Sequence, residues 1–185
     1  HMTRRTNLAF VAAVLFSAAG YTQDRPAPVI SPEVHADRTV TFRLRAPNAQ
    51  AVRLTGEFLK QPAPLEKDEA GVWTAEVGPL EPGMYGYNFL VDEVSHRDPT
   101  HTDLKTGVLW FSSVLRVPGD APLFFDVRKV PHGTVNLHIY PSSSFPGSRR
   151  VAVYTPPGYD PAGATRYPVL YLLHGGGDED SGWST

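Results

Sequence analysis

The motif with the clearest chemical meaning is His174-Gly175-Gly176-Gly177, near the C-terminal end. It follows an apolar run, Tyr167–Leu173, which predicts a strand buried on both faces. Consecutive glycines let the backbone turn so that several N–H groups converge on one point, as in an oxyanion hole that stabilises developing negative charge. Gly176 and Gly177 are the best candidates for such donors. The alternative is a turn that only joins a strand to a loop.

An oxyanion hole needs an attacking group, and this sequence does not supply one. None of its serines has glycine both two residues before and two residues after it, so a Gly-x-Ser-x-Gly nucleophile elbow is absent. The three acidic residues after the glycines, Asp178-Glu179-Asp180, could touch a substrate, but an acidic surface loop is the favoured interpretation.

Four residues suggest a metal site, because His96, Asp98, His101 and Asp103 lie within eight positions. A short loop rarely gives histidine ligands the fixed geometry and supporting hydrogen bonds that they need. We therefore expect no metal there, and no cofactor elsewhere.

The elements that must position these residues are short strands. Apolar and polar residues alternate in 39–45, 52–55, 73–77 and 85–91, and turn residues such as Asp68–Gly71 and Pro82-Gly83 separate these runs. A further apolar run, Val108–Val117, ends at Pro118-Gly119. This pattern predicts an immunoglobulin-like β-sandwich over residues 31–118. Residues 135–140 and 150–154 predict a separate hairpin.

Composition excludes several function classes. The chain has 185 residues, of which 41% are apolar, and its 17 Lys and Arg against 19 Asp and Glu give a formal charge of -2. Such a balance, without a basic run, argues against nucleic acid and against an anionic membrane surface as partners. The sequence has no cysteine, which excludes disulfides, thiolate metal sites and a cysteine nucleophile.

The N-terminal residues predict export. Arg4 and Arg5 precede the apolar run Leu8–Ala19, which is shorter than the roughly 20 residues of a membrane-spanning helix. Residues 1–20 are therefore interpreted as a secretory signal peptide with His1-Met2 as cloning residues, and 21–30 as a linker. We expect a secreted or periplasmic protein that does not contact the membrane after signal cleavage.

The C-terminal part resembles a known enzyme family. Residues 150–160 and 167–175 resemble the opening of the secreted α/β-hydrolase esterases, which include feruloyl, acetyl xylan and enterochelin esterases. The resemblance implies acyl transfer by a Ser-His-Asp/Glu triad, none of whose three positions lies within this chain. It also implies that His174 is structural, and that the chain has an esterase parent but is itself inactive.

That resemblance also implies that residues 133–185 are the N-terminal fragment of a truncated hydrolase domain, joined to the sandwich by a linker, 119–132. In the hydrolase fold the strand that ends at His174 pairs with later strands. We therefore expect this fragment to need the rest of the hydrolase domain or another chain.

The sandwich is similar to the early-set immunoglobulin-like module that precedes isoamylases and glycogen-branching enzymes. The similarity rests on residues 41–49, 71–73, 82–87 and the pairs Val91-Asp92 and Asp98-Pro99. Some such modules bind α-glucans by stacking sugars on exposed tryptophans. Ser95 stands where binders carry one such Trp, and Glu93 replaces their usual Gly, so starch binding is not expected. Trp73 is the remaining candidate for contact with a sugar, although a core position is favoured for it.

Three hypotheses follow from these resemblances. The first is a secreted serine carboxylic ester hydrolase acting on plant cell-wall carbohydrate esters, of the feruloyl or acetyl xylan type. The second is a carbohydrate-binding module without a catalytic role. The third is a siderophore esterase of the enterochelin type.

Overall fold

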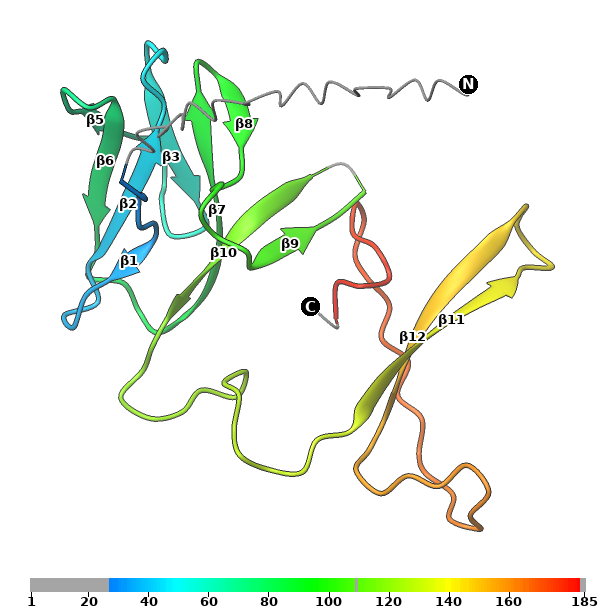
Figure 1. The fold of residues 1–185 in the computed structure, drawn as a ribbon. Helices are drawn as coiled ribbons and strands as arrows, with labels where there is room; N and C mark the ends of the chain where they lie inside the picture. The colour runs from blue at the N-terminus through cyan, green and yellow to red at the C-terminus, as the bar shows by residue number, and fades with distance from the viewer. Residues whose placement is uncertain (1–26, 109, 184–185) are drawn as a thin grey trace, which may run out of the picture.

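The computed structural model describes residues 27–108 and 110–183, and within these ranges it contains strands but no helix. The strands of the first part are β1 (Glu33–Val34), β2 (Val40–Arg45), β3 (Val52–Gly56), β4 (Ala63–Pro64), β5 (Glu66–Lys67), β6 (Val72–Val77), β7 (Gly83–Val91), β8 (Val94–His96), β9 (Leu104–Thr106) and β10 (Phe111–Val117). They form the expected β-sandwich (Figure 1).

Two antiparallel sheets make the sandwich. One has the order β1-β2-β6-β5, and the other has the order β4-β3-β7-β10-β9 with β8 paired to β7. Alternation in the sequence directs one face of each sheet inward: Phe42 of β2, Leu54 of β3, Tyr87 and Phe89 of β7 and Leu115 of β10 are all almost completely buried. The Phe42 and Tyr87 rings meet edge to face across the core, with centroids 4.9 Å apart.

The turn before β6 shows why a glycine is needed there. Gly71 has φ +75°, and a Cβ on it would lie 2.7 Å from the Cα of Pro47. The turn is closed by the Gly71 N–H, which donates to the Asp68 carbonyl, and by the Val72 N–H, which donates to the Asp68 carboxylate. The Asp68–Gly71 signal in the sequence therefore predicted the turn correctly.

A buried carboxylate fixes the loop between β8 and β9. Asp98 is fully buried, accepts a hydrogen bond from the Tyr87 hydroxyl at 2.9 Å, and also accepts from the Thr100 N–H and hydroxyl. Burial, together with the charge of Asp98, raises the pKa of Tyr87 far above its ordinary value.

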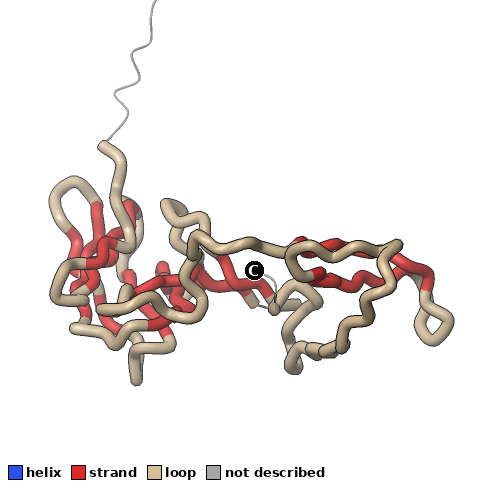
Figure 2. Tube along the Cα trace, turned by 90° about the horizontal axis from the view of Figure 1, so that it is seen from below, coloured by secondary structure: helices blue, strands red, loops and turns tan. Residues whose placement is uncertain are grey.

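The predicted hairpin is present as β11 (Thr134–Pro141) and β12 (Ser148–Thr155), paired antiparallel over their whole length. Figures 1 and 2 show it at a distance from the sandwich, with the C-terminal segment between the two. Apolar side chains of the hairpin, such as Leu137 and Ile139, are exposed.

The strand predicted over Tyr167–Leu173 is wrong for this structure, because these residues belong to no strand. They are also exposed, with Leu170 at 80% and Leu173 at 86%. A strand buried on both faces needs neighbours on both edges and helices on both sides. The described residues provide neither, so the apolar pattern alone does not form a strand.

Candidate functional site

A shallow pocket of about 400 Å³ lies on the outer face of the sheet that contains β3, β7 and β10. Its lining comes from the ends and polar faces of these strands, from β9, and from the residues beside them: Thr55, Gly56, Glu57, Gly86, Tyr87, Asn88, Lys105, Trp110, Phe111 and Ser112. Gly86 helps to keep it open, because a Cβ there would lie 2.9 Å from the Ser112 hydroxyl oxygen and would occupy the floor.

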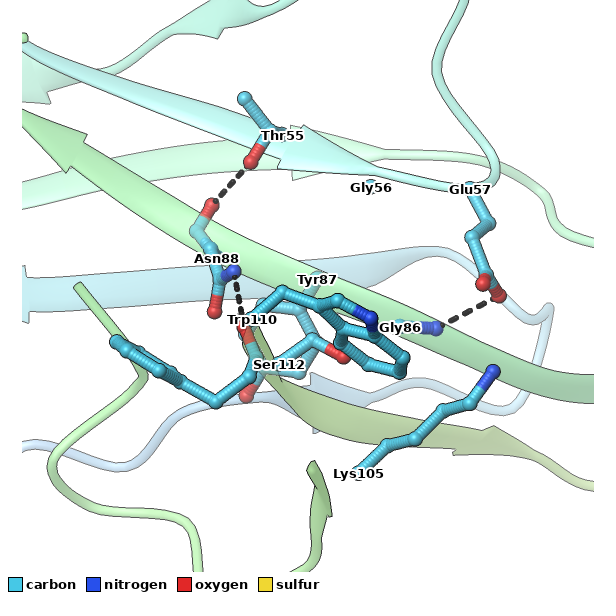
Figure 3. A pocket seen from close by; sticks show the side chains of 10 residues that line it. Thr55, Gly56, Glu57, Gly86, Tyr87, Asn88, Lys105, Trp110 and Ser112 are labelled. Carbon is cyan, nitrogen blue, oxygen red and sulfur yellow. Dashed lines mark hydrogen bonds between the residues drawn. The ribbon is translucent and has the colours of Figure 1, made fainter. Parts of the chain in front are cut away.

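Polar groups in the pocket are held by backbone hydrogen bonds (Figure 3). The Glu57 carboxylate accepts from the Gly86 N–H at 2.9 Å, and the Asn88 side-chain N–H donates to the Phe111 carbonyl at 2.7 Å. The Asn88 side-chain oxygen is buried and has no donor among the described residues. An unpaired buried acceptor is costly, so this amide is suited to receive a donor from a bound molecule or a water.

Aromatic rings form the rest of the pocket wall (Figure 3). Trp110 is 36% exposed and Phe111 is 44% exposed, and the Lys105 ammonium nitrogen lies 5.3 Å from the Trp110 ring centroid. The ammonium partly covers and orients the indole through a cation–π contact. A flat apolar ring beside a carboxylate, an amide and an ammonium can bind a sugar through its C–H face and its hydroxyl groups.

Trp110 also lies near the glycine turn identified from the sequence. The Trp110 indole nitrogen is 3.5 Å from the position that a Cβ on Gly177 would take, and the Val108 N–H donates to the Gly177 carbonyl at 2.9 Å. Gly176 and Gly177 lie in an exposed turn, and Gly177 has φ +87°. Gly177 thus lies close to Trp110 of the pocket wall, although neither candidate oxyanion glycine lines the pocket. No nucleophile elbow lies in the chain for them to serve.

Two of the three acidic residues after the turn, Glu179 and Asp180, bind protein groups. Glu179 accepts hydrogen bonds from Thr106 at 2.7 Å and Ser181 at 2.8 Å, while Arg150 lies 2.6 Å from Asp180. The hydrogen bonds from Thr106 and Ser181, with a smaller contribution from the Arg150 charge, lower the pKa of Glu179. These contacts hold the turn to the rest of the chain through Glu179 and Asp180.

The other sequence candidates lie elsewhere. Trp73 is 7% exposed in the core, as favoured from the sequence, and its indole N–H donates to the Ala46 carbonyl at 2.9 Å, which leaves little ring surface for a sugar. Ser95 lies in the exposed strand β8. His174 is exposed, and its Nδ1 lies 2.9 Å from the Gly175 carbonyl oxygen.

Three of the four residues that suggest a metal site, Asp98, His101 and Asp103, have protein partners. His101 contacts the Val114 carbonyl, and Asp103 pairs with Arg116 at 2.7 Å, while Asp98 is bound to Tyr87 as described above. No group of three or more His, Asp or Glu side chains within the described ranges could hold a metal ion. These ranges also contain no helix long and apolar enough to cross a membrane.

The sequence analysis does not identify Trp110 as a site residue, because Trp110 lies within the apolar run Val108–Val117. The signal was present in the polar face of the same strands, where Thr55, Asn88 and Ser112 alternate with the core residues. Three polar positions on neighbouring strands mark a wet face that can carry a site. Their adjacency depends on the strand order, which the sequence did not reveal.

The first part of the chain is similar to a known family of modules. Residues 30–105 match carbohydrate-binding module 48, the isoamylase N-terminal domain. This matched segment contains β1 to β8 and most of the pocket's polar residues.

A curated relative extends the similarity beyond carbohydrate-binding module 48. An endo-1,4-beta-xylanase/feruloyl esterase of Xylanibacter ruminicola is 32% identical over 158 residues, which is 82% of this chain. The chain spans 22% of the length of that relative. A match of this extent must include residues outside 30–105, so it does not rest on the module alone.

Solved structures were also found. A pullulanase of Klebsiella pneumoniae in complex with maltotriose has a TM-score of 0.36 and 25% identity, covering 46% of this chain and 9% of that chain. The ferric enterobactin esterase of Salmonella typhimurium has a TM-score of 0.44 and 18% identity, covering 65% of this chain and 42% of that chain.

Proposed function

We propose that this chain is the N-terminal part of a secreted serine carboxylic ester hydrolase that acts on plant cell-wall carbohydrate esters of the feruloyl or acetyl xylan type. In this protein the sandwich contacts the carbohydrate, and residues 133–185 begin the esterase domain. The observation that carries the proposal is the similarity to a xylanase/feruloyl esterase, which reaches beyond carbohydrate-binding module 48.

The pocket supports the carbohydrate part of this proposal. Trp110 offers a partly exposed ring, and Asn88 and Glu57 offer acceptors for hydroxyl groups within the same hollow. Trp73 is buried, and position 95 carries a serine in place of a tryptophan. Neither position therefore offers an exposed indole, so stacking of two α-glucan sugars on these positions is not expected. A single platform suits one sugar unit of a decorated xylan chain.

Affinity electrophoresis of the 185-residue chain in gels cast with arabinoxylan, starch or no polysaccharide tests the carbohydrate part. We expect retardation by arabinoxylan that Trp110→Ala abolishes and that Trp183→Ala leaves unchanged, because Trp183 is exposed and does not line the pocket. Equal migration in all gels would overturn carbohydrate binding at this site.

The esterase part predicts that the chain is inert by itself. The mechanism needs a serine, a histidine and an acid in addition to the oxyanion donors, and the chain has no nucleophile elbow. Turnover of nitrophenyl acetate should equal that of a heat-treated sample, and a rate above that control would contradict this assignment of the catalytic residues.

The second candidate is a carbohydrate-binding module without a catalytic role, which the match of residues 30–105 favours. It predicts the same retardation in gels. It differs in giving residues 133–185 no part in an esterase domain.

A further inference from the structure

Residues 106–108, here called the β9–β10 tip, are hydrogen-bonded to the glycine turn and the residues after it. Thr106, at the end of β9, donates from its hydroxyl to Glu179 at 2.7 Å, and the Val108 N–H donates to the Gly177 carbonyl at 2.9 Å. Gly107 makes this approach feasible, because a Cβ on it would lie 2.6 Å from the Gly177 carbonyl oxygen. A backbone hydrogen bond and a side-chain hydrogen bond therefore join two segments about 70 residues apart in the sequence.

The same turn is held from the hairpin side. The Arg150 guanidinium of β12 lies 2.6 Å from Asp180 and 3.7 Å from Glu179. The turn thus joins the sandwich to the β11–β12 hairpin, and both figures of the whole chain show it between them (Figures 1 and 2).

We propose that the β9–β10 tip is a docking element that positions the Gly175–Gly177 turn beside the sugar pocket, with Thr106 and Gly107 as positioning residues. This inference rests on the proposed function and adds to it that pocket and turn form one continuous binding site. Trp110 connects them, since it lines the pocket and its indole nitrogen lies 3.5 Å from the position that a Cβ on Gly177 would take.

The docking is tested by amide hydrogen exchange of the whole chain, followed by NMR, in Thr106→Val and Thr106→Ser. Valine removes the hydroxyl at nearly constant volume, and serine keeps it. The Val108 amide, which binds Gly177, should exchange about fivefold or more faster in Thr106→Val and at the wild-type rate in Thr106→Ser.

The internal control is the Val114 amide, which donates to the Asp103 carbonyl near the other end of the same hairpin. The Val114 amide should exchange at the same rate in the wild type, in Thr106→Val and in Thr106→Ser. Unchanged exchange at Val108 in Thr106→Val would overturn the docking role, and so would an equal acceleration at Val108 and Val114, which indicates a general loss of stability.

Titration with xylotetraose tests the continuous site. We expect shifts of the Asn88 and Trp110 signals together with those of Gly176 and Gly177, and we expect the glycine shifts to disappear in Thr106→Val while Asn88 still responds. Shifts confined to Asn88 and Trp110 in the wild type would overturn the shared site and leave the binding pocket standing. No shift at any residue would overturn carbohydrate binding instead, and the exchange experiment would still decide the docking role.

Discussion

Two features of the structure favour glycine at position 71: its backbone conformation and its closeness to Pro47. Its φ of +75° is costly for any residue with a Cβ, and the Cβ itself would meet Pro47 at 2.7 Å. Left-handed backbone alone costs about 1–2 kcal/mol in an L-residue, and the close approach adds to it.

Gly71→Ala should therefore lower the free energy of unfolding by about 2–3 kcal/mol. Urea denaturation followed by circular dichroism measures this change. Glu69→Ala in the same turn is the control, because Glu69 is exposed, and it should change the free energy by less than about 0.5 kcal/mol. Equal effects of the two variants would contradict the role of the Gly71 backbone.

Tyr87 predicts how stability depends on pH. Its pKa is raised in the folded state by burial and by Asp98, so the folded protein holds the phenolic proton more tightly than the unfolded chain does. This stabilisation is complete below the unfolded pKa of about 10 and is lost as the pH rises above it, by up to about 1.4 kcal/mol per pH unit.

Urea titrations between pH 8 and pH 11 test this with Tyr87→Phe as the comparison. The variant should be about 1–3 kcal/mol less stable at pH 8, because the buried Asp98 loses a donor, but should lose less stability than the wild type above pH 10. Parallel curves for the two proteins would show that Tyr87 does not titrate differently in the folded state.

At the scale of elements, strands differ in whether their apolar faces are covered. Leu115 of β10 is fully buried, whereas Ile139 of β11 is 69% exposed although both lie in regular antiparallel pairs. Strands β10 and β11 are both hydrogen-bonded to a partner strand, but of these two only β10 is further stabilised by the burial of an apolar side chain.

Leu115→Ala should lower the free energy of unfolding of the sandwich by about 2–5 kcal/mol, and Ile139→Thr should change it by less than about 0.5 kcal/mol. Thermal unfolding followed through near-ultraviolet circular dichroism distinguishes them. A large loss in Ile139→Thr would mean that the hairpin contributes to the core.

Local patterns predicted the strands that alternate strongly, and they failed where structure depends on distant residues. Val40–Arg45 and Val72–Val77 could be predicted because each pairs apolar alternation with a clear turn. Strands β8 and β9 were missed because they have three residues each and little apolar content. Tyr167–Leu173 has the composition of a strand, but a strand also needs neighbours for its backbone groups.

The residues of the candidate site also differ in whether local sequence could predict them. Gly176 and Gly177 could be found from the sequence because consecutive glycines are a local signal. Trp110 could not, since the pocket that it lines with Asn88 and Lys105, and its nearness to Gly177, depend on segments far apart in the chain. Only the strand order brings these segments together.

At the scale of the whole molecule, the buried residues are concentrated in the first part of the chain. Every apolar residue of the buried core lies between Val40 and Val117, and the segment 119–132 is mostly exposed. Proteases cut where the backbone can open locally at little cost.

Brief digestion with a low-specificity protease should therefore remove the chain beyond about residue 118 first and leave a resistant fragment that contains β2 to β10. Mass spectrometry of the products over time measures this. Early cuts inside β3, β6 or β7 would contradict the location of the stable core.

The uncovered run Val169–Leu173 has a consequence for handling the protein. Five neighbouring apolar residues without charge or proline, which pair with no strand among the described residues, form the kind of segment that seeds intermolecular sheets. Copies of this chain are expected to self-associate through that run as their concentration rises, and a single lysine in place of Leu172 should raise the solubility limit without altering the sandwich.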